Sequence, residues 1–305
     1  MSDSSSPSPA EPPARFDCTA LVPTMGRPGL LRACLESLRA QDPPLREVIV
    51  LDQSGNGAIC ALAEERGALR IPLRPGGLAR ARNAGLAAAR GEWLFFPDDD
   101  CAVTPGFTAA VVRFLAERPD ADFLCGRVET PDGRPLSAGM GAAPRPLDTP
   151  RAILHSALSA GLLVRRRVIE RVGGFDERFG VGARFPSGEE SDLLLRALAA
   201  GCRGWYVPDA VVLHPEPFGV RDDLAQAGRA YEYGRGWGAL FAKHGTRPLR
   251  PGVLGLYLRY LARAAGGAAL ALPPGRRALA RRYLASLRGR LAGFREFRRE
   301  PGEAP

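Results

Sequence analysis

The sequence has almost no lysine, since Lys243 is the only one among 42 Lys and Arg residues. The formal net charge of +9 is therefore carried by arginine. A preference for arginine over lysine reflects genome composition as much as physical need, so this charge gives only weak support for nucleic-acid binding. We predict no nucleic-acid partner.

Cysteine pairs are also lacking. The six cysteines lie far apart and form no C-x-x-C motif: Cys18, Cys34, Cys60, Cys101, Cys125 and Cys202. This spacing predicts neither a zinc site nor a disulfide framework, and the simplest location is a reducing cytoplasm.

The chain lacks a signal-peptide pattern and a long uninterrupted apolar run. We expect residues 1–16 to form a disordered tail. Residues 253–272 are mostly apolar but contain Arg259 and Arg263. A charged arginine at the centre of a bilayer costs roughly 2.5–3.5 kcal/mol, so we do not expect a spanning helix there.

What the chain does have, from about residue 18 to residue 120, is an alternation of short β-like runs with helical patterns. Strands are predicted at 18–24, 47–54, 68–73 and 92–100, with helices between them. This order is typical of βαβ units. We therefore predict an α/β fold with a mostly parallel central sheet flanked by helices, in a chain long enough for one sizeable core.

Acidic side chains follow the fourth predicted strand, in the stretch LFFPDDDC. Side chains two apart on an extended segment point the same way, so Asp98 and Asp100 share one face. Convergent carboxylates favour Mg²⁺ or Mn²⁺, and ligands of open α/β sheets bind at the carboxyl ends of strands. The alternative is that the acids only cap the next helix, but Thr104 already offers that cap.

These motifs, in this order, resemble the nucleotide-binding half of family 2 glycosyltransferases, which have the GT-A fold and invert the anomeric centre. The matching stretches are PTMGRP, EVIVLDQSG, ARNAG and PDDD. The resemblance implies a nucleotide-sugar donor, UDP-linked by family habit, an aspartate at 52 that meets the base, and a DxD-type metal motif. The donor-binding residues implied are Pro23, Thr24, Arg27, Asp52, Arg80, Asn83, Asp98 and Asp99.

The stretch SGEESDLLLRALAAG predicts a helix with Ser187 as its N-cap and acidic residues in its first turn. It is similar to the acceptor-side segment of the same family. The resemblance implies that Glu190 is the general base, with Glu189 and Asp192 beside it, and leaves open whether Glu189 or Glu190 takes the proton. A purely structural role for these acids is the alternative, because acidic residues are common in a first turn.

A histidine ends the apolar run DAVVLH. The family context favours His214 as a third metal ligand beside Asp98 and Asp100, whereas a lone histidine after a strand is more often structural. Arg80 and Arg82 lie in the predicted helix after the third strand. They either face a diphosphate or sit on a solvated helix face, and the sequence leaves both readings open.

The C-terminal region is predicted to be helical, with Tyr231, Tyr233 and Trp237 near the acceptor side. Its last helix places Leu279, Tyr283, Leu287, Leu291 and Phe294 on one stripe among arginines. Such a helix either lies peripherally on an anionic membrane surface or packs on the catalytic domain. We therefore divide the chain into a tail (1–16), a GT-A domain (17–218, with a donor half 17–130 and an acceptor half 131–218) and a C-terminal helical extension (219–305).

The function expected is metal-assisted transfer of a sugar to the hydroxyl of a glycan, lipid-linked or small-molecule acceptor. Two alternatives stay open: a sugar nucleotidyltransferase and a non-enzymatic, basic, membrane-associated protein. The first is expected to carry a glycine-rich phosphate loop, which VPTMGRPG matches poorly. The second does not explain two acidic clusters.

Overall fold

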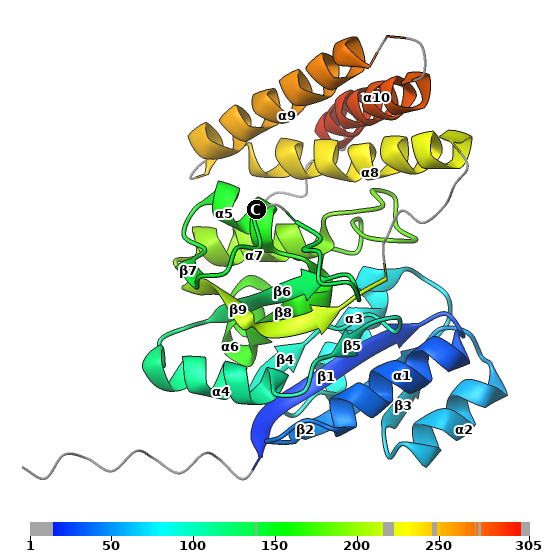
Figure 1. Cartoon of the computed structure of the whole chain (residues 1–305), viewed down its shortest axis with the longest axis vertical. Helices are drawn as coiled ribbons and strands as arrows, with labels where there is room; N and C mark the ends of the chain where they lie inside the picture. Colours follow the sequence, from blue (N-terminus) through cyan, green and yellow to red (C-terminus); the bar gives the residue numbers. More distant parts are fainter. Residues whose placement is uncertain are drawn as a thin grey trace, which may run out of the picture.

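The structure, a computed structural model, describes residues 15–137, 139–215, 223–245, 249–271, 273 and 276–299. It consists of an α/β body covered along one side by a layer of three helices (Figure 1). Residues 1–14, most of the predicted tail, and the predicted domain boundary at 218 lie outside the described residues. The first strand begins at Phe16.

The donor half contains the predicted βαβ units. In chain order they are β1 (Phe16–Thr24), α1 (Pro28–Arg39), β2 (Leu45–Asp52), α2 (Gly57–Glu65), β3 (Leu69–Pro72), α3 (Leu78–Ala88) and β4 (Trp93–Phe95). These four strands pair in parallel. Because Thr24 of β1 aligns with Asp52 of β2, polar residues at both carboxyl ends come to one edge of the sheet.

Beyond β4 the sheet becomes mixed. The remaining elements of the body are β5 (Ala102–Val103), α4 (Phe107–Glu117), β6 (Phe123–Glu129), β7 (Arg145–Pro146), α5 (Pro150–Ser156), η1 (Ser159–Gly161), β8 (Leu162–Arg165), α6 (Arg166–Val172), α7 (Glu189–Ala199) and β9 (Gly204–Leu213). The strand order is β3-β2-β1-β4-β8-β6-β9-β5, with β7 paired to β9. Strand β8 runs antiparallel to both of its neighbours, while β6 and β9 are parallel.

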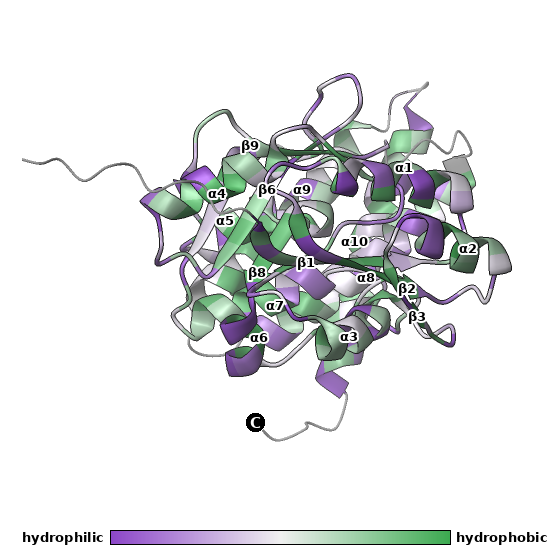
Figure 2. Ribbon diagram, turned by 90° about the horizontal axis from the view of Figure 1, so that it is seen from below, coloured by the Kyte–Doolittle hydropathy of each residue, from purple (hydrophilic) through white to green (hydrophobic). Residues whose placement is uncertain are grey.

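The core lies between this sheet and its helices. Much of strands β6 and β8 is hydrophobic and β1 is so in part, whereas the helices around the sheet expose polar faces (Figure 2). Helix α1 buries Leu31, Cys34, Leu35 and Leu38, a spacing of three and four residues that places one apolar stripe on the sheet. This stripe matches the period predicted from the sequence.

Two predicted helix caps are wrong. Helix α4 is preceded by Gly106, and the Thr104 hydroxyl donates instead to the carbonyl of Val211 on β9. Helix α7 is preceded by Gly188 in the left-handed region, at φ 90°, and the Ser187 hydroxyl donates to the carbonyl of Tyr233. A left-handed turn favours glycine, which explains why glycine holds both positions.

The helical layer consists of α8 (Asp223–His244), α9 (Arg250–Leu270) and α10 (Arg277–Arg299). No helix among the described residues has the length and apolar character to cross a bilayer. The buried residues of α10 are Ala280, Gly289 and Gly293, so small residues, rather than the whole predicted leucine stripe, form its packing face. Leu279 on that stripe stays 40% exposed.

Helices α8 and α10 approach each other through glycines. A Cβ added at Gly289 would overlap the backbone carbonyl of Tyr231, and one added at Gly293 would overlap that of Arg235. The large side chains at the end of α10 pack elsewhere: the Phe294 ring stacks on Tyr257 of α9, with the centroids 4.8 Å apart. The layer therefore depends on the close approach of two backbones.

This packing predicts opposite effects for two glycine substitutions. Gly293→Ala forces the helices apart and should lower the free energy of unfolding by about 1–3 kcal/mol. Gly266→Ala on α9, where an added Cβ meets nothing within 4 Å, should raise it by about 0.5–1 kcal/mol through helix propensity. Chemical denaturation measures both. An increase in both variants would contradict the packing.

Candidate functional site

A pocket of about 320 Å³ opens at the carboxyl edge of the sheet. Its lining comes from the donor half, the acceptor half and α8: Leu78, Asp98, Val128, Leu136, Leu158, Ser159, Ala160, Val181, Pro186, Ser187, Gly188, Glu189, Glu190, His214, Tyr233 and Trp237. We call it the acidic pocket. It brings together residues from both predicted acidic clusters and the predicted histidine.

Four side chains beside the acidic pocket have the spacing of a metal site. Ligand atoms of Asp98, Asp100, Cys101 and His214 all lie within 4.8 Å of one another. Among the described residues, Asp100 Oδ1 is buried without a hydrogen-bond partner, 3.6 Å from His214 Nε2. An orphaned carboxylate oxygen facing an imidazole fits a divalent cation.

The electrostatics of this group agree with a cation site. Burial raises the pKa of Asp98, while Arg82 and His214 oppose the rise. Burial also raises the pKa of Cys101 well above its ordinary value, so its thiol stays neutral. The donor set is then two carboxylates and one imidazole, with Cys101 as a neighbour that the sequence motif did not single out. Such a set suits Mn²⁺ more readily than Mg²⁺.

The middle aspartate of the motif has different partners from Asp98, although β4 ends at Phe95, so the predicted strand over 92–100 is too long and its two-residue period does not extend to the aspartates. Asp99 is buried and accepts a 2.6 Å hydrogen bond from the Thr24 hydroxyl. It also forms an ion pair with Arg27, whose Nη1 lies 2.9 Å from Asp100 Oδ2. Thr24 and Arg27 therefore hold the acidic loop in place, and Pro23 is buried in β1 opposite Leu51.

A fully buried arginine joins the two acidic clusters. Arg82 of α3 lies 3.0 Å from Asp98 Oδ1 through Nη2 and 3.1 Å from Glu189 Oε1 through Nη1. Its guanidinium also lies 5.5 Å from the centre of the Phe175 ring. The sequence left open whether Arg82 contacts a diphosphate or lies on a solvated helix face. Its side chain is 0% exposed, so the prediction of a solvated face is wrong.

The two glutamates of α7 have different partners. Glu189 is committed to Arg82, whereas the Glu190 carboxylate accepts a 3.3 Å hydrogen bond from the Ser191 hydroxyl. Burial, together with the neighbouring charge of Glu189, raises the pKa of Glu190 to about 8. Glu190 therefore exchanges its proton near neutral pH, as a general base requires.

Asp192 faces away from the acidic pocket. It is fully buried and lies 2.8 Å from His244 Nε2, 2.6 Å from Lys243 Nζ and 2.9 Å from Arg196 Nε. Burial works against its ionisation, but the His244 hydrogen bond, Lys243 and Arg196 outweigh it and hold its pKa well below the ordinary range. Asp192 thus anchors α7 to α8, which corrects its expected place beside the base.

Asp52 is buried at the end of β2. Its Oδ1 accepts from the backbone and hydroxyl of Ser54, and its Oδ2 accepts from Arg70 at 2.8–2.9 Å. Burial opposes ionisation, but Ser54 and then Arg70 outweigh it and lower the pKa of Asp52. Since the carboxylate already accepts three hydrogen bonds and has a second ion-pair contact with Arg70, direct contact with a base requires Arg70 or Ser54 to move.

Two other residues expected at the donor site lie outside the lining of the acidic pocket. The Asn83 amide donates to the Phe175 carbonyl at 2.9 Å and accepts from the Phe175 amide at 2.8 Å, so it fixes the segment that leads to α7. This corrects the expected donor contact. Arg80 is exposed, and its stem lies against Gly76.

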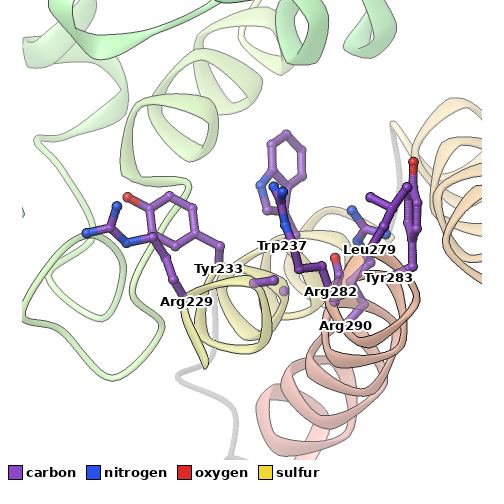
Figure 3. Close-up of a pocket in the computed structure, with 10 residues that line it drawn as sticks. Arg229, Tyr233, Trp237, Leu279, Arg282, Tyr283 and Arg290 are labelled. Carbon is purple, nitrogen blue, oxygen red and sulfur yellow. The ribbon is translucent and has the colours of Figure 1, made fainter. Parts of the chain in front are cut away.

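Helix α8 closes the acidic pocket with Tyr233 and Trp237. The same two rings line a neighbouring pocket of about 300 Å³ between α8 and α10 (Figure 3). Of the three aromatic residues expected near the acceptor side, Tyr233 and Trp237 line both pockets and Tyr231 lines neither.

Comparison with known proteins agrees with this geometry. The family model described as "Glycosyl transferase family 2" matches residues 19–172. A "Pre-mycofactocin glycosyltransferase" of Mycobacterium tuberculosis is 29% identical over 238 residues, covering 72% of this chain and 47% of the relative. "Succinoglycan biosynthesis protein ExoO" of Rhizobium meliloti is 30% identical, covering 64% and 59%. The chain therefore spans about half of the length of the first relative.

Solved glycosyltransferases share the fold. A mannosyltransferase from Pyrobaculum calidifontis, in complex with GDP-Man and Mn²⁺, has a TM-score of 0.62 at 22% identity and covers 94% of this chain and 90% of its own. S. aureus TarS (residues 1–349) with UDP-GlcNAc has a TM-score of 0.62 at 20% identity, covering 86% and 78%. The family match removes the two alternatives, a nucleotidyltransferase and a non-enzymatic protein. The chain belongs to glycosyl transferase family 2 and has the GT-A fold of a glycosyltransferase.

Proposed function

We propose that this protein transfers a sugar from a nucleotide-sugar donor to an acceptor hydroxyl by direct displacement with inversion. The observation that carries this proposal is the acidic pocket, where Asp98, His214 and the proton acceptor Glu190 line one cavity with the aromatic rings of α8, while Asp100 completes the cation group beside it. The structures with GDP-Man and UDP-GlcNAc are of proteins with this fold. We favour a UDP-linked sugar because of the resemblance of the β2 aspartate to the family motif.

On the donor side, Asp98, Asp100 and His214 would hold a divalent cation. When bound, Mn²⁺ or Mg²⁺ supplies electrostatic neutralisation of the leaving diphosphate. Arg27 and Thr24 fix the loop that carries these carboxylates through Asp99 and Asp100. Arg82 fixes the orientation of Asp98 from the other side.

On the acceptor side, Glu190 takes the proton of the attacking hydroxyl. Glu189 is less suited to this role because its carboxylate is held by Arg82. The Glu190 carboxylate is not ion-paired within the described part of the chain and lines the cavity. Tyr233 and Trp237 give flat apolar surfaces beside it, which suit the faces of sugar rings. The acceptor class is a glycan, a glycolipid or a small glycosylated molecule.

The cation group gives the first prediction for the site. Asp100→Asn removes one charge and the orphaned oxygen, and should lower Mn²⁺ affinity by at least about tenfold, measured by calorimetry. Asp209→Asn, whose carboxylate is 69% exposed, is the matched control and should bind Mn²⁺ as the parent does. Unchanged Mn²⁺ affinity in Asp100→Asn would exclude this site.

The base gives the second prediction. Glu190→Gln removes the proton acceptor with little change of volume and should lower kcat by roughly 10²–10⁴, while donor affinity is retained. Since the pKa of Glu190 is raised to about 8, kcat of the parent should rise with pH up to about 8 and then level off. The variant should lose this rise. A parent-like rate in Glu190→Gln, with a loss in Glu189→Gln, would transfer the role to Glu189.

The base-binding position gives the third prediction. Asp52→Asn loses the charge that holds Arg70 and should weaken UDP binding by about tenfold, which corresponds to about 1.4 kcal/mol. Asp17→Asn, a surface change in the same strand region whose carboxylate is 48% exposed, is the control. UDP affinity within about twofold of the parent in Asp52→Asn would show that this residue does not support the base.

A further inference from the structure

A second cavity, of about 360 Å³, lies between α5, α9, α10 and the loop after β6. We call it the basic pocket, and it is lined by Leu136, Ser137, Leu154, His155, Tyr260, Arg263, Ala264, Tyr283, Ser286 and Arg290. Its lining carries two arginines, one histidine and four hydroxyls but no carboxylate. Arg290 and His155 are partly buried, whereas Arg263 is exposed. A partly buried cation with no carboxylate beside it favours the binding of an anion.

Arg290 is the more buried of the two arginines that line the basic pocket. Its Nη1 donates to the Tyr260 carbonyl at 3.0 Å, and the guanidinium lies 5.4 Å from the centre of the Tyr260 ring. Its Nε is buried with no hydrogen-bond partner, and no acidic residue in the described part of the chain pairs with it. Burial lowers the pKa of Arg290. The Arg290 guanidinium therefore has no anionic partner among the described residues.

The surroundings of His155 show that the excess charge belongs to the whole basic pocket. Burial lowers the pKa of His155, and four arginines lower it further: Arg151, Arg263, Arg145 and Arg259. Arg263, also in the lining, is exposed and forms no ion pair or hydrogen bond among the described residues. Two arginines, from α9 and α10, therefore line one hollow.

The basic pocket lies next to the acidic pocket and shares lining residues with the pockets around it. Leu136 lines both the basic and the acidic pocket. Tyr283, Ser286 and Arg290 also line the pocket between α8 and α10, where Figure 3 shows Arg290 and Tyr283 on α10 opposite Trp237 on α8. A molecule whose hydroxyl meets Glu190 could extend past these aromatic rings to the arginines.

We propose that the basic pocket binds a phosphate or diphosphate group of the acceptor. This inference rests on the proposed function and adds to it that the acceptor is anionic. Guanidinium groups bind phosphate oxygens through paired N–H donors, and the serine and tyrosine hydroxyls supply further donors. A diphosphate carries enough charge to neutralise Arg263 and Arg290 together, which a single carboxylate does not.

Inorganic pyrophosphate is the probe for this site. Calorimetry is run in EDTA, so that the cation group of the acidic pocket does not contribute. Arg290→Gln and Arg263→Gln should each weaken pyrophosphate binding by about tenfold or more, because each loses charge-assisted hydrogen bonds. Arg288→Gln, exposed on the same helix as Arg290, is the matched control and should bind as the parent does. Because two variants are tested, the proposal can still be judged if one of them fails to fold.

Competition then distinguishes the sources of the group. A sugar 1-phosphate and a lipid-linked sugar diphosphate in detergent each carry the chemistry, and the true acceptor should displace pyrophosphate from the parent more strongly than the other. Equal pyrophosphate affinity in the parent, Arg290→Gln and Arg263→Gln would overturn the proposal, as would absence of binding to the parent. Mn²⁺-dependent hydrolysis of a nucleotide-sugar by the parent, measured separately, shows whether the proposed function itself holds.

Discussion

The site depends on the buried guanidinium of Arg82. It is the one group that contacts both acidic clusters described for the pocket, at Asp98 in the loop after β4 and at Glu189 in the first turn of α7. Breaking a buried pair by removing one partner costs about 3–5 kcal/mol, because the other charges stay buried. The two carboxylates would otherwise repel each other across the pocket. Arg82 therefore sets the distance between the metal-binding side and the acceptor side, and leaves Glu190 as the carboxylate able to exchange a proton.

The C-terminal helices form part of this arrangement. Helix α8 gives Tyr233 and Trp237 to the acidic pocket and holds Asp192 of α7 through Lys243 and His244. The close glycine contacts of α10 fix α8 in turn. Since Glu190 lies two residues before Asp192, the position of Glu190 depends on helices that follow the parallel part of the sheet in sequence. The family model ends at residue 172, before both α7 and α8.

The sequence predicted the parts of the fold that depend on local pattern. The βαβ units and the apolar stripe of α1 follow from local periods in the sequence. The different partners of Asp98 and Asp99 do not, because β4 ends at Phe95 and both residues lie beyond it. The short strands β7 and β8 and the antiparallel half of the sheet were not predicted, because pairing with distant strands forms them. Helix α5 was missed although its local start signals, the Thr149 cap and Pro150, stand in the sequence. The two wrong predictions of helix caps have the same cause, because the Thr104 and Ser187 hydroxyls donate to carbonyls that are distant in the sequence. Arg82 was ambiguous among many arginines because only tertiary contacts distinguish a buried arginine from an exposed one.

Three acids within one turn of α7 show how position decides chemistry. Glu189, Glu190 and Asp192 share the same helix start and its favourable dipole. Asp192 gains His244, Lys243 and Arg196, so it stays ionised and structural. Glu190 gains burial and a like charge instead, so its pKa rises to about 8. Neighbouring groups whose environments push their pKa values apart take different roles, and here the difference comes from which face of one helix meets α8 and which meets the cavity.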